Sequence, residues 1–352
     1  MQYSGLVTAG ALRGAAWHGH EMIFGYTFAV IAGFLLTAVR NWTQRETPAG
    51  AWLAAIVLLW IAGRILVLTP FALAAAAVNA LFPLAVAVGI GIPLAASANR
   101  RNYFFVALLA GASVAVLLFH LAVLGAIAWP ARIGLQAGLD LVLFVVAVVA
   151  GRVIPMFTNN GVPGAGASRR PWIERASLGS VLALVALDVA GVSGTPLAIL
   201  ALAAAAMHGA RLWLWHPWRT LRAPLVWVLH AAYAWVVVHL ALRAAAEWQL
   251  VAQPLALHAL TIGVIGGMTI GMMTRTARGH TGRPLAADRF EVACYALVQL
   301  AALARVAGGI VLPERYLETV VLSAACWSAA FALFCVRYWP VLTRPRLDGK
   351  PG

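Results

Sequence analysis

Runs of about twenty apolar residues recur along the whole chain, and no other feature of the sequence constrains the fold as strongly. At a rise of 1.5 Å per residue, a helix of that length crosses a hydrocarbon core of about 30 Å. Of the 352 residues, 63% are hydrophobic and only 10% are charged, whereas soluble domains carry about a quarter charged residues. A water-soluble fold could not cover this much apolar surface, so the sequence predicts an integral membrane protein.

The predicted fold class is all-α, a polytopic transmembrane helical bundle of about eleven helices that forms one membrane domain over residues 1–352. Helices are expected because a lipid-exposed chain must satisfy its own backbone polar groups, and a barrel would need alternating segments of about ten residues. The predicted spans are residues 17–39, 51–69, 72–97, 103–127, 132–154, 176–193, 195–215, 223–243, 255–275, 287–311 and 316–339.

Basic residues cluster at every second connection between these spans, and such connections face the cytoplasm. The C-terminus is therefore predicted inside and the N-terminus outside. The net charge of +14 thus indicates topology, and we expect no nucleic-acid partner. The basic clusters include Arg100 and Arg101, Arg169 and Arg170, Arg219 and Arg222, Arg278 and Arg283, and Arg344, Arg346 and Lys350. The alternate connections hold only Arg132, Arg243 and Arg315, with Arg13 before the first span.

Glycines predict a close helix contact in the ninth span. Gly263, Gly267 and Gly271 recur at intervals of four and share one helix face, which lets another backbone approach. A Gly-, Pro- and Ser-rich connection at 159–171 divides the chain into five and six predicted helices without a convincing repeat. The three cysteines lack CxxC spacing, so they predict neither a disulfide framework nor a thiolate metal site.

The chain has nine histidines, and an ionisable group at membrane depth usually faces a bundle interior, a partner or a cavity. Neutral imidazole suits haem iron or copper. The alternative for each is a hydrogen-bonded helix residue, which we favour for His239. The predicted topology separates two levels: His18, His20, His120, His239 and His258 towards the outer side, and His208 and His230 deeper, with His216 and His280 near loops.

The strongest local constellation is Trp17-His18-Gly19-His20-Glu21. On a regular helix His18 and Glu21 share a face, so the carboxylate could orient the imidazole or act as a base. His20 points about 200° away from His18, so a regular helix cannot bring both to one metal ion. The alternative interpretation is a polar helix start at the membrane interface beside an anchoring tryptophan.

Buried charges keep other functions open. Asp140 and Asp188 lie in predicted spans, and intramembrane acids can belong to proton paths. Arg64 and Arg305 also lie in spans, where each needs an acidic partner or must reach the interface. A proton-coupled transporter using buried His and Asp residues is therefore an alternative function, although no inverted repeat is recognisable. A membrane assembly factor or scaffold is a third.

Three segments together resemble the NnrS family of bacterial haem- and copper-containing membrane proteins linked to nitric oxide stress. They are residues 17–43 (WHGHEMIFGYTFAVIAGFLLTAVRNWT), 151–160 (GRVIPMFTNN) and 258–284 (HALTIGVIGGMTIGMMTRTARGHTGRP). The intervening helices fit in order and spacing. The resemblance implies a multi-pass protein of the bacterial inner membrane that binds noncovalent haem and copper. It also implies nitric oxide or iron-nitrosyl species as partners, in a nitric oxide stress response or nitric oxide metabolism.

The resemblance also implies the ligands, but it identifies no catalytic residue and no axial pairing. His18, His20 and His258 are the candidate metal ligands, and Glu21 is the carboxylate beside them. Relatives usually carry one more hydrophobic helix before the WHxHE segment, so the eleven helices here correspond to twelve minus the first. The full set of implied cofactor ligands is His18, His20, His120, His208, His230 and His258.

Overall fold

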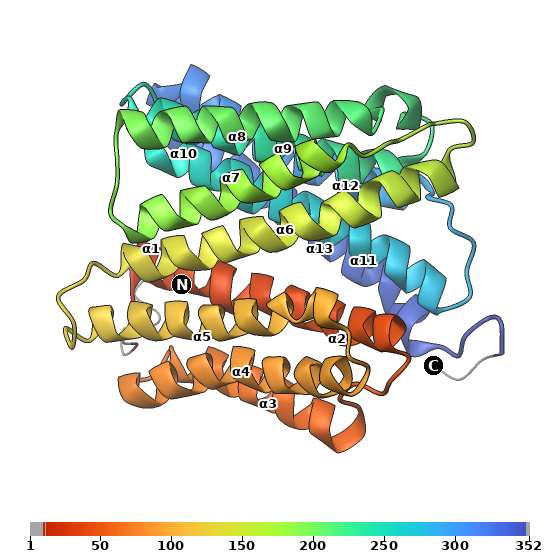
Figure 1. The fold of residues 1–352 in the computed structure, drawn as a ribbon, viewed down its shortest axis with the longest axis horizontal. Coiled ribbons are helices and arrows are strands. Elements are labelled where there is room, and N and C mark those ends of the chain that lie inside the picture. Colours follow the sequence, from red (N-terminus) through yellow and green to blue (C-terminus); the bar gives the residue numbers. More distant parts are fainter. Residues whose placement is uncertain (1–9, 11, 350–352) are drawn as a thin grey trace. The chain divides into compact units, whose positions relative to one another are not determined.

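The computed structural model describes residues 10 and 12–349, and every regular element in them is a helix. Within this described part, nine helices are long and apolar enough to cross a membrane. The predicted fold class is therefore confirmed: the chain is an all-helical, polytopic membrane protein (Figure 1). Two predicted spans are not among the nine, α3 (Gly50–Leu66, 17 residues) and α7 (Pro171–Val189, 19 residues). The predicted outer N-terminus and the basic Lys350 lie outside the described residues.

Most helices begin and end within a few residues of the predicted spans, and the larger differences have local causes. α5 (Phe104–Val123) stops short of the predicted residue 127 because Gly125 adopts a left-handed φ of 70°, a conformation that commonly ends helices. α6 (Arg132–Gly161) continues past the predicted residue 154 although it contains Pro155. Membrane helices tolerate proline where the freed carbonyl finds another partner.

The chain divides into two compact units, Met1–Leu143 and Phe144–Gly352. The boundary lies inside α6, before the Gly-, Pro- and Ser-rich connection at 159–171. That connection is ordered by Asn159, whose side-chain amide pairs with both the N–H and the carbonyl of Ala167 at 2.8 and 2.9 Å. The prediction of one membrane domain concerns both units together and stays a prediction.

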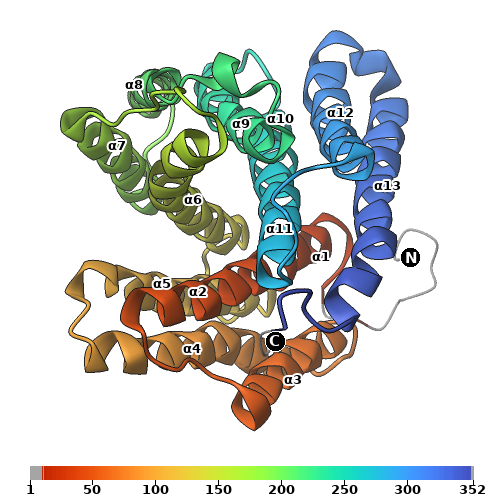
Figure 2. The same ribbon diagram turned by 90° about the vertical axis from the view of Figure 1, so that its right-hand side faces the viewer.

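The N-terminal unit begins with one continuous helical segment that changes its winding twice. An α-helical start, α1 (Gly14–His20), passes into the π-helical η1 (Glu21–Thr27) and then into α2 (Phe28–Thr43). α4 (Ala72–Ala96) packs against α2, α3 and α5 (Figure 2). The first segment, which carries the WHGHE sequence, therefore lies in a packed helical layer of its own unit.

The C-terminal unit is organised around α9 (Pro224–Glu247), which packs against α8 on one side and against the α10–η4–α11 segment on another. α12 and α13 pack against each other, and α12 also contacts η4. The bounds of these elements are α8 (Thr195–Leu214), α10 (Gln253–His258), η4 (Ala259–Gly266), α11 (Gly267–His280), α12 (Arg289–Val311) and α13 (Tyr316–Thr343).

The predicted glycine seam is confirmed, and its partner is α9. A Cβ atom on Gly267 would lie 2.7 Å from the Cβ of Ala232, and one on Gly271 would lie 2.9 Å from Leu229. A Cβ on Gly263 would overlap the indole of Trp235. Only glycine permits this approach of the two helices.

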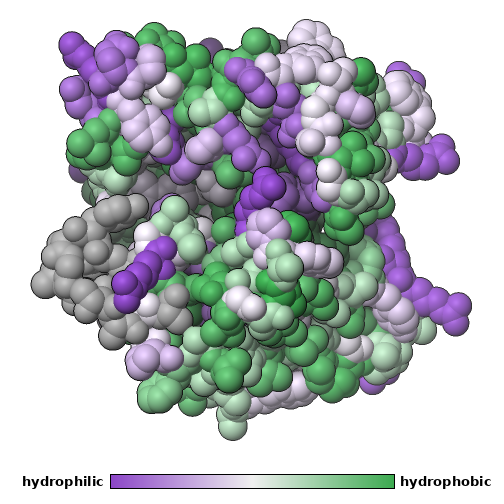
Figure 3. All heavy atoms as spheres, turned by 90° about the vertical axis from the view of Figure 1, so that its left-hand side faces the viewer, coloured by the Kyte–Doolittle hydropathy of each residue, from purple (hydrophilic) through white to green (hydrophobic). Residues whose placement is uncertain are grey.

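Large apolar side chains cover much of the surface drawn in Figure 3. Among the described residues, Leu73 and Val336 are 73% and 75% exposed. Exposed apolar surface on this scale marks an interaction surface in a soluble protein, whereas in a bilayer it contacts lipid tails at no cost.

Candidate functional site

Both π-helical segments begin directly after a histidine predicted as a ligand. η1 starts at Glu21, after His20, and η4 starts at Ala259, after His258. π-turns are rare and frequently occur at functional sites. They also change the register of the helix. Glu21 contacts the adjacent His20, and the sharing of a helix face by His18 and Glu21 stays a prediction.

His20 and His120 bring two imidazoles together inside the N-terminal unit. Their Nε2 atoms are 3.0 Å apart, and the two residues are 0% and 3% exposed. Phe24 and Phe119 lie beside His20, with ring centroids 5.6 and 5.4 Å from the imidazole. The result is a pair of nitrogen atoms facing each other in an apolar, water-poor setting.

Hydrogen bonds determine where the protons on this pair lie. Nδ1 of His20 donates to Oε1 of Glu21 at 2.9 Å, because a carboxylate only accepts. A neutral His20 therefore presents a lone pair on Nε2, and Nε2 of His120 donates to it. Arg64 donates to the same Glu21 oxygen at 2.9 Å and also to the side chain of Asn79. Arg64, left without a partner by the sequence, thus holds Glu21 in place.

Glycines make room for this arrangement. A Cβ on Gly25 would overlap the guanidinium of Arg64, so the absence of a side chain lets Arg64 reach Glu21. The Gly25 carbonyl accepts a hydrogen bond of 2.9 Å from the Trp60 indole. On α6, a Cβ on Gly134 would lie 2.7 Å from the backbone nitrogen of Phe119. α6 therefore approaches α5 closely, next to His120.

The C-terminal unit contains a second buried polar cluster, centred on Arg211. This side chain is 1% exposed and makes two hydrogen bonds to Glu174, at 2.9 and 2.5 Å. It also donates to the Tyr233 hydroxyl at 3.0 Å, and its guanidinium lies 5.2 Å from the Trp215 ring centroid. A Cβ on Gly151 would overlap the same guanidinium. The GRVIP segment thus passes Arg211 at a position where only glycine fits.

Both ring nitrogens of His208 are bonded within this cluster. Nε2 donates to the Ser177 carbonyl at 3.2 Å, because a carbonyl only accepts. Nδ1 then accepts from the Tyr233 hydroxyl at 2.6 Å. A neutral His208 has no lone pair left for a metal ion in this arrangement.

His230 differs, because one of its nitrogens is buried without a partner. Thr158 donates its hydroxyl proton to the Ile154 carbonyl at 2.8 Å, so it accepts from Nε2 of His230, also at 2.8 Å. Nδ1 of His230 then carries a lone pair, and no hydrogen-bond partner reaches it from the described residues. The Trp215 ring lies 6.4 Å away between centroids.

The chain matches a known protein family over nearly its whole length. Residues 1–346 match the family described as NnrS protein. The chain belongs to the NnrS family. Its membership supports a membrane protein related to nitric oxide at the level of the family. No curated protein matches the chain.

The remaining histidines of this NnrS protein have simpler surroundings. Nδ1 of His239 donates to the Ala256 carbonyl at 2.8 Å, so His239 is the hydrogen-bonded helix residue that the sequence favoured. Nδ1 of His258 donates to the Pro254 carbonyl at 2.5 Å, so a neutral His258 ring carries its proton on Nδ1. His18 and His280 are exposed, and His216 contacts the Ala165 carbonyl at 2.9 Å.

Buried charged side chains have polar partners within their own units: Arg305, for example, donates to the Tyr316 hydroxyl at 2.6 Å. Arg243, counted from the sequence as part of an outer connection, is 8% exposed in α9 and pairs with Asp188. Asp140 accepts from Gln136 at 2.8 Å. Sequence reasoning missed Arg211 as a site residue, although an arginine three residues after His208 in an apolar span requires an acidic partner.

The buried imidazoles differ in which of the cofactors implied by the family they can hold. No group of three or more His, Cys, Asp or Glu side chains in the described parts of the chain is arranged to hold a metal ion. Two nitrogens 3.0 Å apart can both reach one ion at about 2 Å from each, once the Nε2 proton of His120 has moved to its Nδ1. The His20–His120 pair therefore suits a copper ion, and the lone pair of His230 would suit haem iron.

Proposed function

We propose that this NnrS protein binds copper through His20 and His120 and noncovalent haem through His230. It would act in a nitric oxide stress response or in nitric oxide metabolism in the bacterial inner membrane. The observation that carries the proposal is the buried imidazole pair with Glu21 on Nδ1 of His20. A carboxylate on the far nitrogen is the usual outer partner of a metal-binding histidine.

Residues around the pair prepare it before any ion arrives. Glu21 keeps the proton of His20 on Nδ1, so that Nε2 presents its lone pair. Arg64 orients Glu21 by a charge-assisted hydrogen bond. Phe24 and Phe119 lower the local polarity, which strengthens these electrostatic interactions.

His230 is prepared in a comparable way in its own unit. Thr158 fixes the ring by accepting from Nε2, which leaves Nδ1 as the ligand atom. The aromatic residues Trp215 and Tyr233 line the same buried cluster. Bound haem or copper would supply the redox-active metal to which nitric oxide binds.

His18 and His258 are further candidate ligands, and their roles stay predictions. His18 is exposed at the start of the first helix, and Nδ1 of His258 is engaged by its own helix.

The experiment is a metal analysis of purified His20→Ala and His120→Ala variants. We expect copper per folded protein to fall at least about tenfold in each, because two imidazoles supply the proposed site. His280→Ala, which replaces an exposed imidazole, is the control and should keep wild-type copper. Absorption spectra with and without nitric oxide report on haem in the same samples. Wild-type copper in both His20→Ala and His120→Ala would refute the copper site.

The proposed orientation has its own test. Basic residues at every second connection support a cytoplasmic C-terminus and a cytoplasmic connection 159–171. Ser168 is exposed in that connection. A cysteine at Ser168 should therefore resist an impermeant reagent in intact cells and react after the cells are opened. Rapid labelling from outside would reverse the topology.

A further inference from the structure

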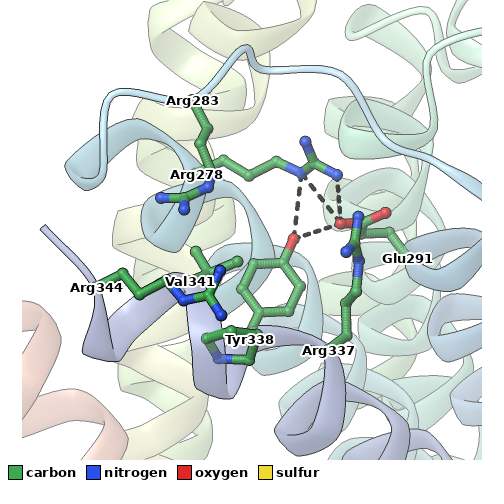
Figure 4. Close-up of a pocket in the computed structure, with 8 residues that line it drawn as sticks. Arg278, Arg283, Glu291, Arg337, Tyr338, Val341 and Arg344 are labelled. Carbon is green, nitrogen blue, oxygen red and sulfur yellow. Dashed lines mark hydrogen bonds and ion pairs between the residues drawn. The ribbon is translucent and has the colours of Figure 1, made fainter. Parts of the chain in front are cut away.

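A cavity of about 190 Å³ lies in the C-terminal unit, where the end of α11 meets the start of α12 and the end of α13. Figure 4 shows arginine side chains converging on it from three sides. No histidine contributes to it, so it is separate from the cofactor sites proposed above. Its lining is Arg278, Arg283, Glu291, Arg337, Tyr338, Pro340, Val341 and Arg344.

The carboxylates near this cavity are already engaged. Glu291 is 1% exposed and accepts from Arg278 at 2.6 Å, from the Tyr338 hydroxyl at 2.5 Å and from the backbone N–H of Asp288 at 2.8 Å. Asp288 in turn accepts from Arg337 at 2.7 Å. These contacts fix one wall of the cavity and bring Arg278 and Arg337 close to charge balance.

Arg283 and Arg344 supply the excess positive charge. Among the residues that the structure describes, neither has a carboxylate within ion-pair distance. Arg344 is exposed directly after α13, and the Arg283 side chain donates to the Thr281 carbonyl at 3.5 Å. Four arginines and two carboxylates thus leave two positive charges at the mouth of a formed cavity, a setting that attracts an anion.

The size of the cavity limits which anionic groups it can hold. Sites for drug-sized molecules occupy roughly 300–1,000 Å³, so a cavity of about 190 Å³ suits one small group and not a nucleotide. Guanidinium forks match the oxygens of a phosphate group in two parallel hydrogen bonds. The chemistry therefore favours a single phosphate with two or more charged or polar oxygens.

We propose that Arg283 and Arg344, on the wall built by Glu291, Arg278 and Tyr338, bind a phosphate group. The neighbouring surface of α13 favours a phospholipid as its source. Val336, Trp339 and Leu342 are 75%, 73% and 57% exposed beside the arginines of that helix. Acyl chains can lie along these residues while the phosphate occupies the cavity, and tryptophan is typical of the headgroup level. Basic pockets at helix ends bind anionic headgroups in this manner.

The test compares the purified protein with an Arg283→Gln/Arg344→Gln double variant in detergent. Thermal unfolding is recorded during titration with phosphatidylglycerol, with phosphatidylcholine, and with inorganic phosphate against chloride at equal ionic strength. We expect phosphatidylglycerol to raise the melting temperature at lower concentration than phosphatidylcholine. The double variant should need at least about tenfold more phosphatidylglycerol, since it loses two charge-assisted contacts to the phosphate.

The matched control is Arg100→Gln/Arg101→Gln, which removes the same charge from two exposed arginines in another basic connection. It should titrate like the wild type. Stabilisation by inorganic phosphate that the double variant loses would identify free phosphate as the source, whereas a response to lipid alone would identify the headgroup. Equal titration curves for the wild type and the double variant would overturn the proposal. Melting without ligand and gel filtration establish that each variant is folded.

Discussion

The N-terminal and C-terminal units each bury two histidines that were predicted as ligands, but the surroundings of these imidazoles differ. In the N-terminal unit, His20 and His120 direct their Nε2 atoms at each other across 3.0 Å. In the C-terminal unit, both nitrogens of His208 are bonded to protein groups, while His230 keeps one buried nitrogen without a partner among the described residues. Burial is nearly the same in all four, from 0% to 3% exposed.

This comparison shows that burial alone does not separate a ligand from a structural histidine. The two ring nitrogens have separate roles, and the bond made by one determines whether the other offers a lone pair. Glu21 fixes that choice for His20, and Thr158 fixes it for His230. Tyr233 and Ser177 bond both ring nitrogens of His208, so neither nitrogen offers a lone pair.

The largest expected effect separates His230 from His208. His230→Ala should lower haem iron per folded protein at least about tenfold, because it removes the proposed ligand. His208→Ala should keep the haem and lower the melting temperature, since it removes the acceptor of the buried Tyr233 hydroxyl proton at a cost of about 1–3 kcal/mol. Iron analysis and the Soret band measure the first effect, and thermal unfolding measures the second. Haem loss in His208→Ala with retention in His230→Ala would reverse the assignment.

The second effect concerns the cluster that holds His208. Arg211→Met leaves Glu174 as an unpaired charge and should destabilise the protein by about 3–5 kcal/mol. Adding Glu174→Leu should restore part of the loss, because the uncompensated charge is then gone. Arg40→Met is the control, since its pair with Glu46 is exposed and such pairs contribute about 0–1 kcal/mol. Equal melting of Arg211→Met and the control would mean that the buried pair contributes little.

A smaller change tests the N-terminal pair through its carboxylate. Glu21→Gln keeps the shape of the side chain but removes the charge that orients His20, and outer partners of this kind contribute about 10–100-fold in metal affinity. Copper titration of the variant beside Glu46→Gln, an exposed carboxylate, measures the difference. An unchanged copper affinity would show that Glu21 only pairs with Arg64.

The smallest effect compares two glycine-to-alanine substitutions that should change the stability in opposite directions. Gly267→Ala places a Cβ 2.7 Å from that of Ala232 and should destabilise the C-terminal unit by about 1–3 kcal/mol. Gly179, on α7, has open space around it. Gly179→Ala should therefore stabilise its helix by about 0.5–1 kcal/mol. Thermal unfolding compares the two, and stabilisation by both would argue against a tight seam between α9 and α11.

Much of the helical framework was predictable because its signal is local. The start of α6 at Arg132, the seam at Gly267 and the apolar face of α13 follow from residue type and spacing. The winding of the first helix was not predictable. A π-turn at Glu21 differs from an α-turn by one residue in its hydrogen bonds, and the same apolar pattern accommodates both.

The sequence by itself determined that the chain crosses the membrane and that most of its histidines lie in apolar spans, since both follow from hydropathy along one dimension. Only the tertiary structure decided that His20 meets His120, a hundred residues away. It also decided that Arg243 pairs with Asp188 instead of facing an outer connection. The physical reason is that a ligand needs a lone pair in a particular direction, and side chains from other helices fix that direction.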